Sequence, residues 1–366
     1  TMIWSGDLNT GSVYDVPRYG TNMATQAYNQ YVNSMNQNNS SSSLRTQQIQ
    51  GGQGEAGFAP DVQFSNSWVR ADVGASPIGF PITNVLGGVE FSPRVGPVTF
   101  RVSAERRSIT NSVLSYGGLR DPNYNSALGR YALNHYGSQL ASQWGQEWGG
   151  VVTNHFHGQV EATLGNTILY GGGGYAIQTG KNTRSNNERE AGIGANTLVW
   201  HNANMLVRIG VSLTYFGYAN NQDFYTYGQG GYFSPQSYYS ATVPIRYAGQ
   251  HKRLDWDVTG SVGYQVFHEH SSPFFPTSSL LQAGAQYIAD SYVQNATASD
   301  YLSEETVDRA YYPGDSIASL TGGFNARVGY RFTHNLRLDL SGRWQKAGNW
   351  TESGAMISVH YLIMDQ

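Results

Sequence analysis

The chain contains no cysteine, so disulfide bridges and thiolate-ligated metal sites are excluded. Charged residues are scarce as well, at 13% of 366 residues, which is about half the share in an ordinary soluble domain. The formal net charge is only −3 and gives no electrostatic indication of a nucleic-acid partner. No apolar run reaches the ~18 residues of a membrane-spanning helix, and the opening residues do not form a signal peptide. We therefore expect a processed chain or a piece of a larger protein.

Glycine and tyrosine are abundant instead, with 44 and 26 residues. The stretch 253–266, RLDWDVTGSVGYQV, alternates apolar residues such as Leu254 and Trp256 with polar ones such as Arg253 and Asp255. Such a long run of strict period two predicts a long strand with one apolar face and one polar face.

The same alternation predicts about fourteen strands along the chain. They cover roughly 1–9, 54–64, 67–77, 84–94, 97–109, 149–163, 166–179, 188–200, 203–219, 236–248, 252–269, 317–333, 335–347 and 351–363. Several exceed the usual ~5–6 residues, and strands of ~9–11 residues can cross a bilayer at a tilt.

The connections between these strands alternate between short and long. Short ones fall at 65–67, 95–97, 165–167, 201–203, 249–251 and 333–335, and long ones at about 10–53, 110–148, 220–235 and 270–316. All short links therefore gather at one end, as do periplasmic turns opposite the extracellular loops of an outer-membrane barrel. The predicted fold class is all-β: a transmembrane antiparallel β-barrel of outer-membrane type, one domain over 1–366, in the bacterial cell outer membrane.

Two soluble architectures share the alternation and are weighed against the barrel. A β-sandwich uses shorter strands and lacks the two-ended loop pattern. A β-propeller would repeat every ~40–45 residues, and no such repeat is present.

The polar faces of the predicted strands supply the candidate pore-lining residues. The alternation places on these faces Arg208, Arg246, Arg253, Asp255, Asp257, Arg327, Arg337, Asp339 and Arg343, with Arg70, Asp72, Arg101, Glu105, Glu161 and Arg331 in the same class. Charges of both signs predict cross-strand ion pairs rather than a one-sign ion filter. Such a wall suits a neutral, hydroxyl-rich solute.

Catalysis and metal binding have weak support in the sequence. His155 and His157 lie two residues apart on one polar face with Glu161 four residues further on, but no third ligand or nucleophile elbow completes a site. The glycine run 171–174 lacks the ending of a phosphate-binding loop. We expect wall-lining histidines, no catalytic residue, no metal, no cofactor and no enzymatic activity.

The segment 223–239, DFYTYGQGGYFSPQSYY, concentrates aromatic residues around glycines in one long connection. Tyrosine rings offer flat faces on which sugar rings stack, and a hydroxyl at the edge. Tyr225, Tyr227, Tyr232 and Phe233 are therefore candidates for stacking on a solute or for closing a pore. The alternative is a packed loop or an aromatic belt at the membrane interface.

Four segments resemble a known family. YTYGQGGYFSPQSYYS (225–240), RRSITNSVLSYGG (106–118), WVRADVGASPIGF (68–80) and NVLGGVEF (84–91) are similar to the C-terminal barrel of cellulose synthase operon protein C. The resemblance extends from about Trp68 to Tyr361. It implies a barrel of about sixteen strands that follows an array of tetratricopeptide repeats, so two strands would lie upstream of this chain. Repeats of ~34 residues are absent here. The three longest connections are longer than the family pattern, with short helices expected at 22–35 and 278–293.

The resemblance also implies a function. The family exports nascent cellulose, a β-1,4-glucan, across the outer membrane in exopolysaccharide secretion and biofilm formation. The implied partners are the cellulose polymer and outer-membrane lipid. Through the absent N-terminal repeats they extend to a periplasmic cellulase, peptidoglycan and the inner-membrane cellulose synthase. Three alternatives remain open: a general diffusion porin, an exporter of another polysaccharide, and an outer-membrane hydrolase or adhesin.

Overall fold

The computed structural model describes residues 2–9, 52–120, 147–279, 282, 286, 311–347 and 350–361. Strands dominate these ranges, and a short helix, α3 (Val113–Gly117), lies in the connection between two of them. None of the helices in these ranges has the length and apolar character needed to cross a membrane.

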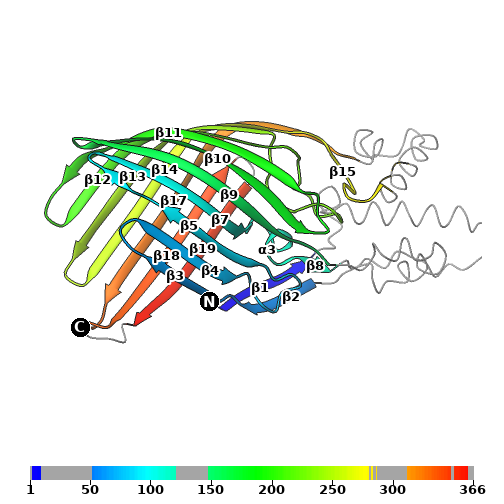
Figure 1. The fold of residues 1–366 in the computed structure, drawn as a ribbon, viewed down its shortest axis with the longest axis horizontal. Coiled ribbons are helices and arrows are strands. Elements are labelled where there is room, and N and C mark those ends of the chain that lie inside the picture. The colour runs from blue at the N-terminus through cyan, green and yellow to red at the C-terminus, as the bar shows by residue number, and fades with distance from the viewer. Residues whose placement is uncertain are drawn as a thin grey trace, which may run out of the picture.

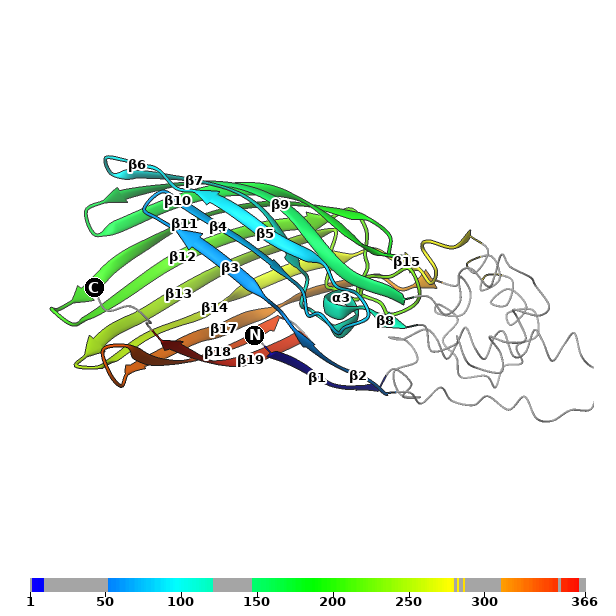
Figure 2. The same cartoon turned by 60° about the horizontal axis from the view of Figure 1, so that its bottom comes forward.

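Fifteen of the described strands form one antiparallel sheet whose curved ribbons are seen in Figures 1 and 2. Its main path runs through β3 (Asp61–Ser65), β4 (Val69–Ala75), β5 (Val85–Phe91), β7 (Val98–Ser108), β9 (Glu147–Leu164), β10 (Thr167–Lys181), β11 (Asn186–His201), β12 (Met205–Tyr218), β13 (Ser237–His251), β14 (Leu254–Glu269), β17 (Asp315–Arg331), β18 (Leu336–Ala347) and β19 (Trp350–Tyr361). Along this path, each strand pairs with the strand before it and the strand after it in the sequence order given above. The predicted all-β antiparallel architecture is confirmed.

Six further strands lie off the main path. Within the large sheet, β6 (Arg94–Val95) pairs with β7 and β8 (Leu119–Arg120) pairs with β9. Two separate pairs join β1 (Met2–Asn9) to β2 (Gly52–Phe58), and β15 (Ser272–Pro273) to β16 (Tyr311–Tyr312).

The predicted strand boundaries agree with the structure to within a few residues, with two corrections. The predicted strand 54–64 is two strands, because Pro60 has no backbone N–H to donate and separates β2, which pairs with β1, from β3, which pairs with β4. The predicted short turn at 249–251 is also wrong, because β13 continues to His251. Lys252, with a φ of 55°, forms the turn instead.

The short connections share one end of the sheet and are built from local polar caps. The Asn66 side chain accepts hydrogen bonds of 2.8 Å from the backbone N–H groups of Trp68 and Val69. Asn202 makes the equivalent contacts after β11, and the Thr333 hydroxyl accepts from Leu336 N at 3.0 Å after β17. Such side-chain-closed turns need few residues, so strands reverse tightly at this end.

The apolar face of the sheet is exposed and the polar face is shielded, which is the reverse of a sheet in a soluble protein. On β14, Val262, Tyr264 and Val266 are 59%, 51% and 45% exposed, whereas the intervening Gln265 is fully buried. In register with Tyr264, an apolar row crosses the sheet through Ile193, Leu213, Ala241, Tyr264 and Leu320. The apolar face is therefore the outer, lipid-facing surface and the polar face is the inner wall.

This arrangement predicts losses of stability of different size at adjacent positions of β14. Val262→Arg places a charge on the lipid-facing surface near the middle of the strand and should lower the free energy of unfolding by about 2–4 kcal/mol. Ser261→Arg, the matched control, extends toward the inner wall beside Gly323 and should cost less than about 1 kcal/mol. Urea titration of the protein folded in lipid vesicles measures both, and equal losses would contradict the assignment of the faces.

Candidate functional site

The inner wall carries charged side chains that pair with one another. Arg246 on β13 holds Asp257 on β14 through two contacts, Nε to Oδ1 at 2.9 Å and Nη2 to Oδ2 at 2.5 Å. Arg101 lies between Glu90 and Glu161, with N to O distances of 3.6 and 3.4 Å. These contacts are the cross-strand ion pairs expected of a mixed-charge wall.

The largest group of predicted pore-lining residues meets on β14, β17 and β18. The Arg337 Nη2 atom lies 2.9 Å from Asp255 Oδ2 and 2.7 Å from Asp339 Oδ1, and Arg327 Nη2 lies 3.8 Å from Asp255 Oδ2. The middle position between the two aspartates is Gly329, which pairs with Asp255 on one side and Asp339 on the other. A Cβ at Gly329 would stand 2.3 Å from Arg337 Nη2, so the absence of a side chain there makes room for this cluster.

The other three predicted arginines lie apart from this cluster. Arg208 on β12 stands directly opposite Arg246 on β13, and its buried Nη1 atom has no hydrogen-bond partner among the described residues. Arg253 lies at the short-turn end, where Nη1 donates to the backbone oxygen of Phe332 at 2.8 Å. Arg343 pairs in register with Asn325.

At the opposite end of the sheet, several connections fold against one another in a unit that we call the loop cluster, residues 112–119, 219–236, 270–278 and 311–312. Ser112, the N-cap of α3, donates through its hydroxyl to Gly231 O at 2.6 Å. Gln229 Nε2 donates to Ser272 Oγ at 3.0 Å and to Pro273 O at 2.7 Å. Connections from distant parts of the chain are therefore joined directly to each other.

Gly231 lies where the 219–236 segment comes close to α3, and its backbone conformation explains why this position is a glycine. Its φ is 66°, a left-handed conformation that side chains disfavour. A Cβ there would lie 2.9 Å from both Ser112 Oγ and Leu114 Cδ2. Gly231 thus allows the 219–236 segment to rest against α3.

The predicted aromatic residues all lie inside the loop cluster or along its edge. Tyr225 and Tyr227 pack against a core of Leu114, Leu119 and Trp148. The side chain of Tyr232 is only 1% exposed, and Asn186 Nδ2 donates to its hydroxyl at 3.1 Å. Phe233 meets Phe267 edge to face, with ring centroids 5.0 Å apart.

Burial also governs the ionisation of this cluster. Desolvation raises the pKa of the Tyr232 and Tyr312 hydroxyls further above physiological pH, at which a tyrosine is neutral even when exposed. Tyr312 stacks on Phe224 with ring centroids 3.8 Å apart and an interplanar angle of 6°. The cluster is therefore held by apolar packing and neutral hydrogen bonds.

One group of inner-wall residues has the composition of a metal site. His155 and His157 face Glu190 on β11, and the three ligand atoms lie within 4.8 Å of one another. The carboxylate considered in the sequence, Glu161, contacts Arg101 instead. Glu190 reaches the histidines from a strand that is not adjacent to theirs, and only the strand register reveals this.

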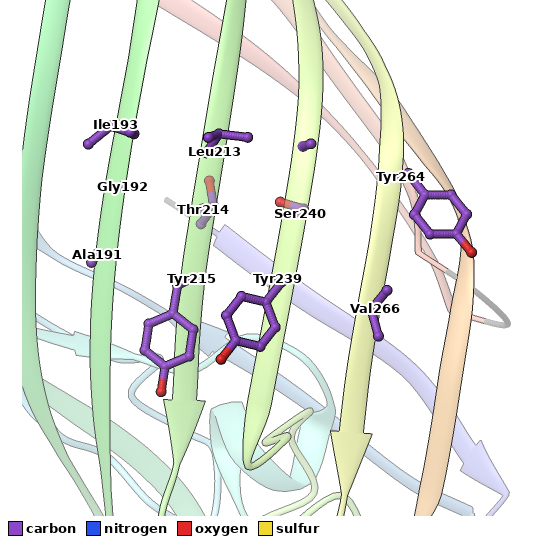
Figure 3. A pocket seen from close by; sticks show the side chains of 11 residues that line it. Ala191, Gly192, Ile193, Leu213, Thr214, Tyr215, Tyr239, Ser240, Tyr264 and Val266 are labelled. Carbon is purple, nitrogen blue, oxygen red and sulfur yellow. The ribbon is translucent and has the colours of Figure 1, made fainter.

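A shallow apolar groove on the outer surface has a different character (Figure 3). Ile193, Leu213 and Val266 line it, and Tyr215 and Tyr239 stand together at its lower end in the view, with ring centroids 5.0 Å apart. Its residues belong to the lipid-facing surface, and the paired tyrosines fit the aromatic belt of an outer-membrane protein. It is separate from the inner wall.

Several predictions concern residues outside the described ranges. Most of the connections 10–53, 110–148 and 270–316 belong to this group. So do the helix expected at 22–35 and most of the one expected at 278–293.

Comparison with known proteins identifies the family of the chain. The family described as "Cellulose synthase operon protein C C-terminus" matches residues 2–364. Cellulose synthase 1 operon protein C of Komagataeibacter xylinus is 98% identical over 366 residues, which cover 100% of this chain and 28% of that protein. Cellulose synthase operon protein C of Salmonella typhimurium is 28% identical over 84% of this chain and 23% of its own length.

Among solved structures, a bacterial polysaccharide outer membrane secretin aligns with a TM-score of 0.44 at 11% identity, over 85% of this chain and 83% of its own. The chain spans little more than a quarter of the curated relatives it matches. The family match covers nearly every residue and confirms the resemblance seen in the sequence. The chain belongs to the C-terminal family of cellulose synthase operon protein C.

Proposed function

We propose that the chain forms an outer-membrane channel that conducts nascent β-1,4-glucan from the periplasm to the cell surface. Family membership supplies the substrate class. The inverted sheet is the observation that carries the proposal, since it combines a lipid-facing apolar surface with a polar inner wall. A polar wall is what a hydroxyl-rich polymer needs in order to cross an apolar membrane.

The wall chemistry supports movement rather than tight binding. Its charges are paired, as in Arg246–Asp257 and Arg337–Asp339, so they offer a polymer hydrogen bonds without a strong net field. Neutral groups such as Thr259 and Asn325, which pair in register and are not buried, lie on the same face. Each contact can be exchanged for water or for a neighbouring contact, which a moving polymer requires.

The direction of transport follows from the two ends of the sheet. Short turns are typical of the periplasmic end, and long connections are typical of the cell surface. We place polymer entry at the short-turn end. We further propose that polymer synthesis drives movement and that the remainder of the full-length protein contacts the synthase, a periplasmic cellulase and peptidoglycan.

The loop cluster is proposed as the closure of the outer end. It joins connections from separate strand pairs through Gln229, Thr226 and Ser112. The burial of Tyr232 favours closure over stacking on the polymer, since its ring contacts Tyr218 within the protein.

The transport proposal predicts selective block by soluble β-1,4-glucans. Single-channel current through the full-length protein in a planar bilayer should fall with added cellohexaose, because the oligosaccharide occupies the polar lumen. Maltohexaose, an α-1,4-linked control of equal size, should block more weakly. Equal block by both would favour a general porin or an exporter of another polysaccharide, and current unaffected by either would contradict a glucan channel.

The closure proposal predicts a channel that opens when the loop cluster is loosened. The double variant Thr226→Val with Gln229→Ala removes side-chain hydrogen bonds to Phe274, Ser272 and Pro273. At ~1 kcal/mol each, three lost bonds shift a closed-to-open equilibrium by more than about a hundredfold. Open probability in planar bilayers measures this shift. Gln250→Ala, at the short-turn end, is the control, and equal open probability in both variants would contradict the closure.

A further inference from the structure

Two histidines and a glutamate converge on one point of the inner wall. His155 and His157 are two residues apart on β9 and therefore share a face. His155 Nε2 lies 2.9 Å from Glu190 Oε1, and His157 Nδ1 lies 2.5 Å from the same oxygen. All three side chains are partly shielded, with about a fifth to a quarter of their surface exposed.

Gly174 is what allows these side chains to meet. It lies on β10 between the two strands, in register with His157 on one side and Glu190 on the other. A Cβ at this position would stand 2.7 Å from Glu190 Oε1 and 2.8 Å from His155 Nε2. The ligand atoms therefore occupy the space directly above a glycine, where any other residue would intrude.

A second carboxylate, that of Glu105, contacts the Nδ1 atom of His155, the ring nitrogen that does not face Glu190. Glu105 on β7 pairs in register with His155, and its Oε1 lies 3.5 Å from His155 Nδ1. Metal-binding histidines commonly give their remaining ring N–H to a carboxylate, which fixes the ring and its tautomer. Glu188, across Ala176 from His155, places a further carboxyl group on the same wall.

We propose that His155, His157 and Glu190 bind one transition-metal ion of the Zn²⁺ class in the inner wall, with Glu105 as a positioning residue. Two imidazoles and a carboxylate suit Zn²⁺ or Cu²⁺ and are a poor set for Mg²⁺ or Ca²⁺. Bonds of ~2.0–2.2 Å separate tetrahedral ligand atoms by about 3.4 Å, so a small withdrawal of Glu190 opens the centre. Three protein ligands leave a fourth position for water or a solute hydroxyl.

The test compares Zn²⁺ binding by the full-length protein and its variants. After removal of metal by a chelator, wild type in detergent is titrated calorimetrically with ZnCl₂. The variant His155→Ala with His157→Ala should lose one equivalent, and Glu190→Gln should weaken that equivalent at least tenfold. Glu105→Gln should weaken it by about 10–100-fold.

The chain offers a matched control in His268 and His270. They have the same spacing, and their rings lie 5.1 Å apart, yet no carboxylate completes a three-ligand group with them among the described residues. His268→Ala with His270→Ala should retain the full stoichiometry. All variants are checked for heat-modifiable migration, which reports a folded barrel.

A second readout identifies the ligands directly. One equivalent of Cu²⁺ should give an electron paramagnetic resonance spectrum with nitrogen splitting in wild type, and this splitting should vanish in the His155→Ala, His157→Ala variant. Equal Zn²⁺ stoichiometry in wild type and this variant, or equal loss in the control pair, would overturn the proposal. The residues would then form a hydrogen-bonded cluster only.

Discussion

A sheet that faces lipid on its apolar side must satisfy its polar side chains from within, and most features of this protein follow from that constraint. The exposed row through Leu213 and Tyr264 leaves the alternate positions of β14, among them Asp255, Asp257 and Thr259, on a polar inner wall. The polar residues therefore bond to one another across strands. Pairs such as Arg246–Asp257 are the structural counterpart of a core in a soluble protein.

Glycine makes this cross-strand bonding possible at three places. Gly88 lies in register between Asp72 and Glu105, Gly174 between His157 and Glu190, and Gly329 between Asp255 and Asp339. At each place, a side-chain contact between the two flanking strands crosses the glycine of the middle strand: Arg107 with Asp72, His155 with Glu190, and Arg337 with Asp255. The wall thus combines charge clusters that span three strands with a backbone that remains regularly paired.

The sequence predicted the strands well, because alternation over ten or more residues determines both the element and its two faces. It also placed the charged residues around Asp255 and Arg337 on the inner wall. It could not predict their partners, because partners such as Glu190 depend on register between strands far apart in the chain. The break at Pro60 was overlooked for a different reason: the alternating pattern continues past this residue, although its backbone has no N–H to donate to a neighbouring strand.

The loop cluster shows the other limit of sequence reasoning. Aromatic composition marked 223–239 as functional, but composition does not distinguish rings that contact a solute from rings that contact each other. Tyr232 and Phe233 are in the second group. The neighbouring Tyr225 and Tyr227 pack against the core around Leu114 of α3, a contact that exists only because the sheet brings the two connections to the same end.

Thiol labelling of this cysteine-free chain can determine which face of β14 meets lipid and which meets the polar lumen. Single variants Thr259→Cys, Ser261→Cys, Val262→Cys and Tyr264→Cys on β14 would be exposed to a charged, membrane-impermeant maleimide in outer-membrane vesicles. We expect labelling at 259 and 261, which face the lumen, and protection by lipid at 262 and 264. Labelling of 262 and 264 with protection of 259 and 261 would contradict this assignment of the faces.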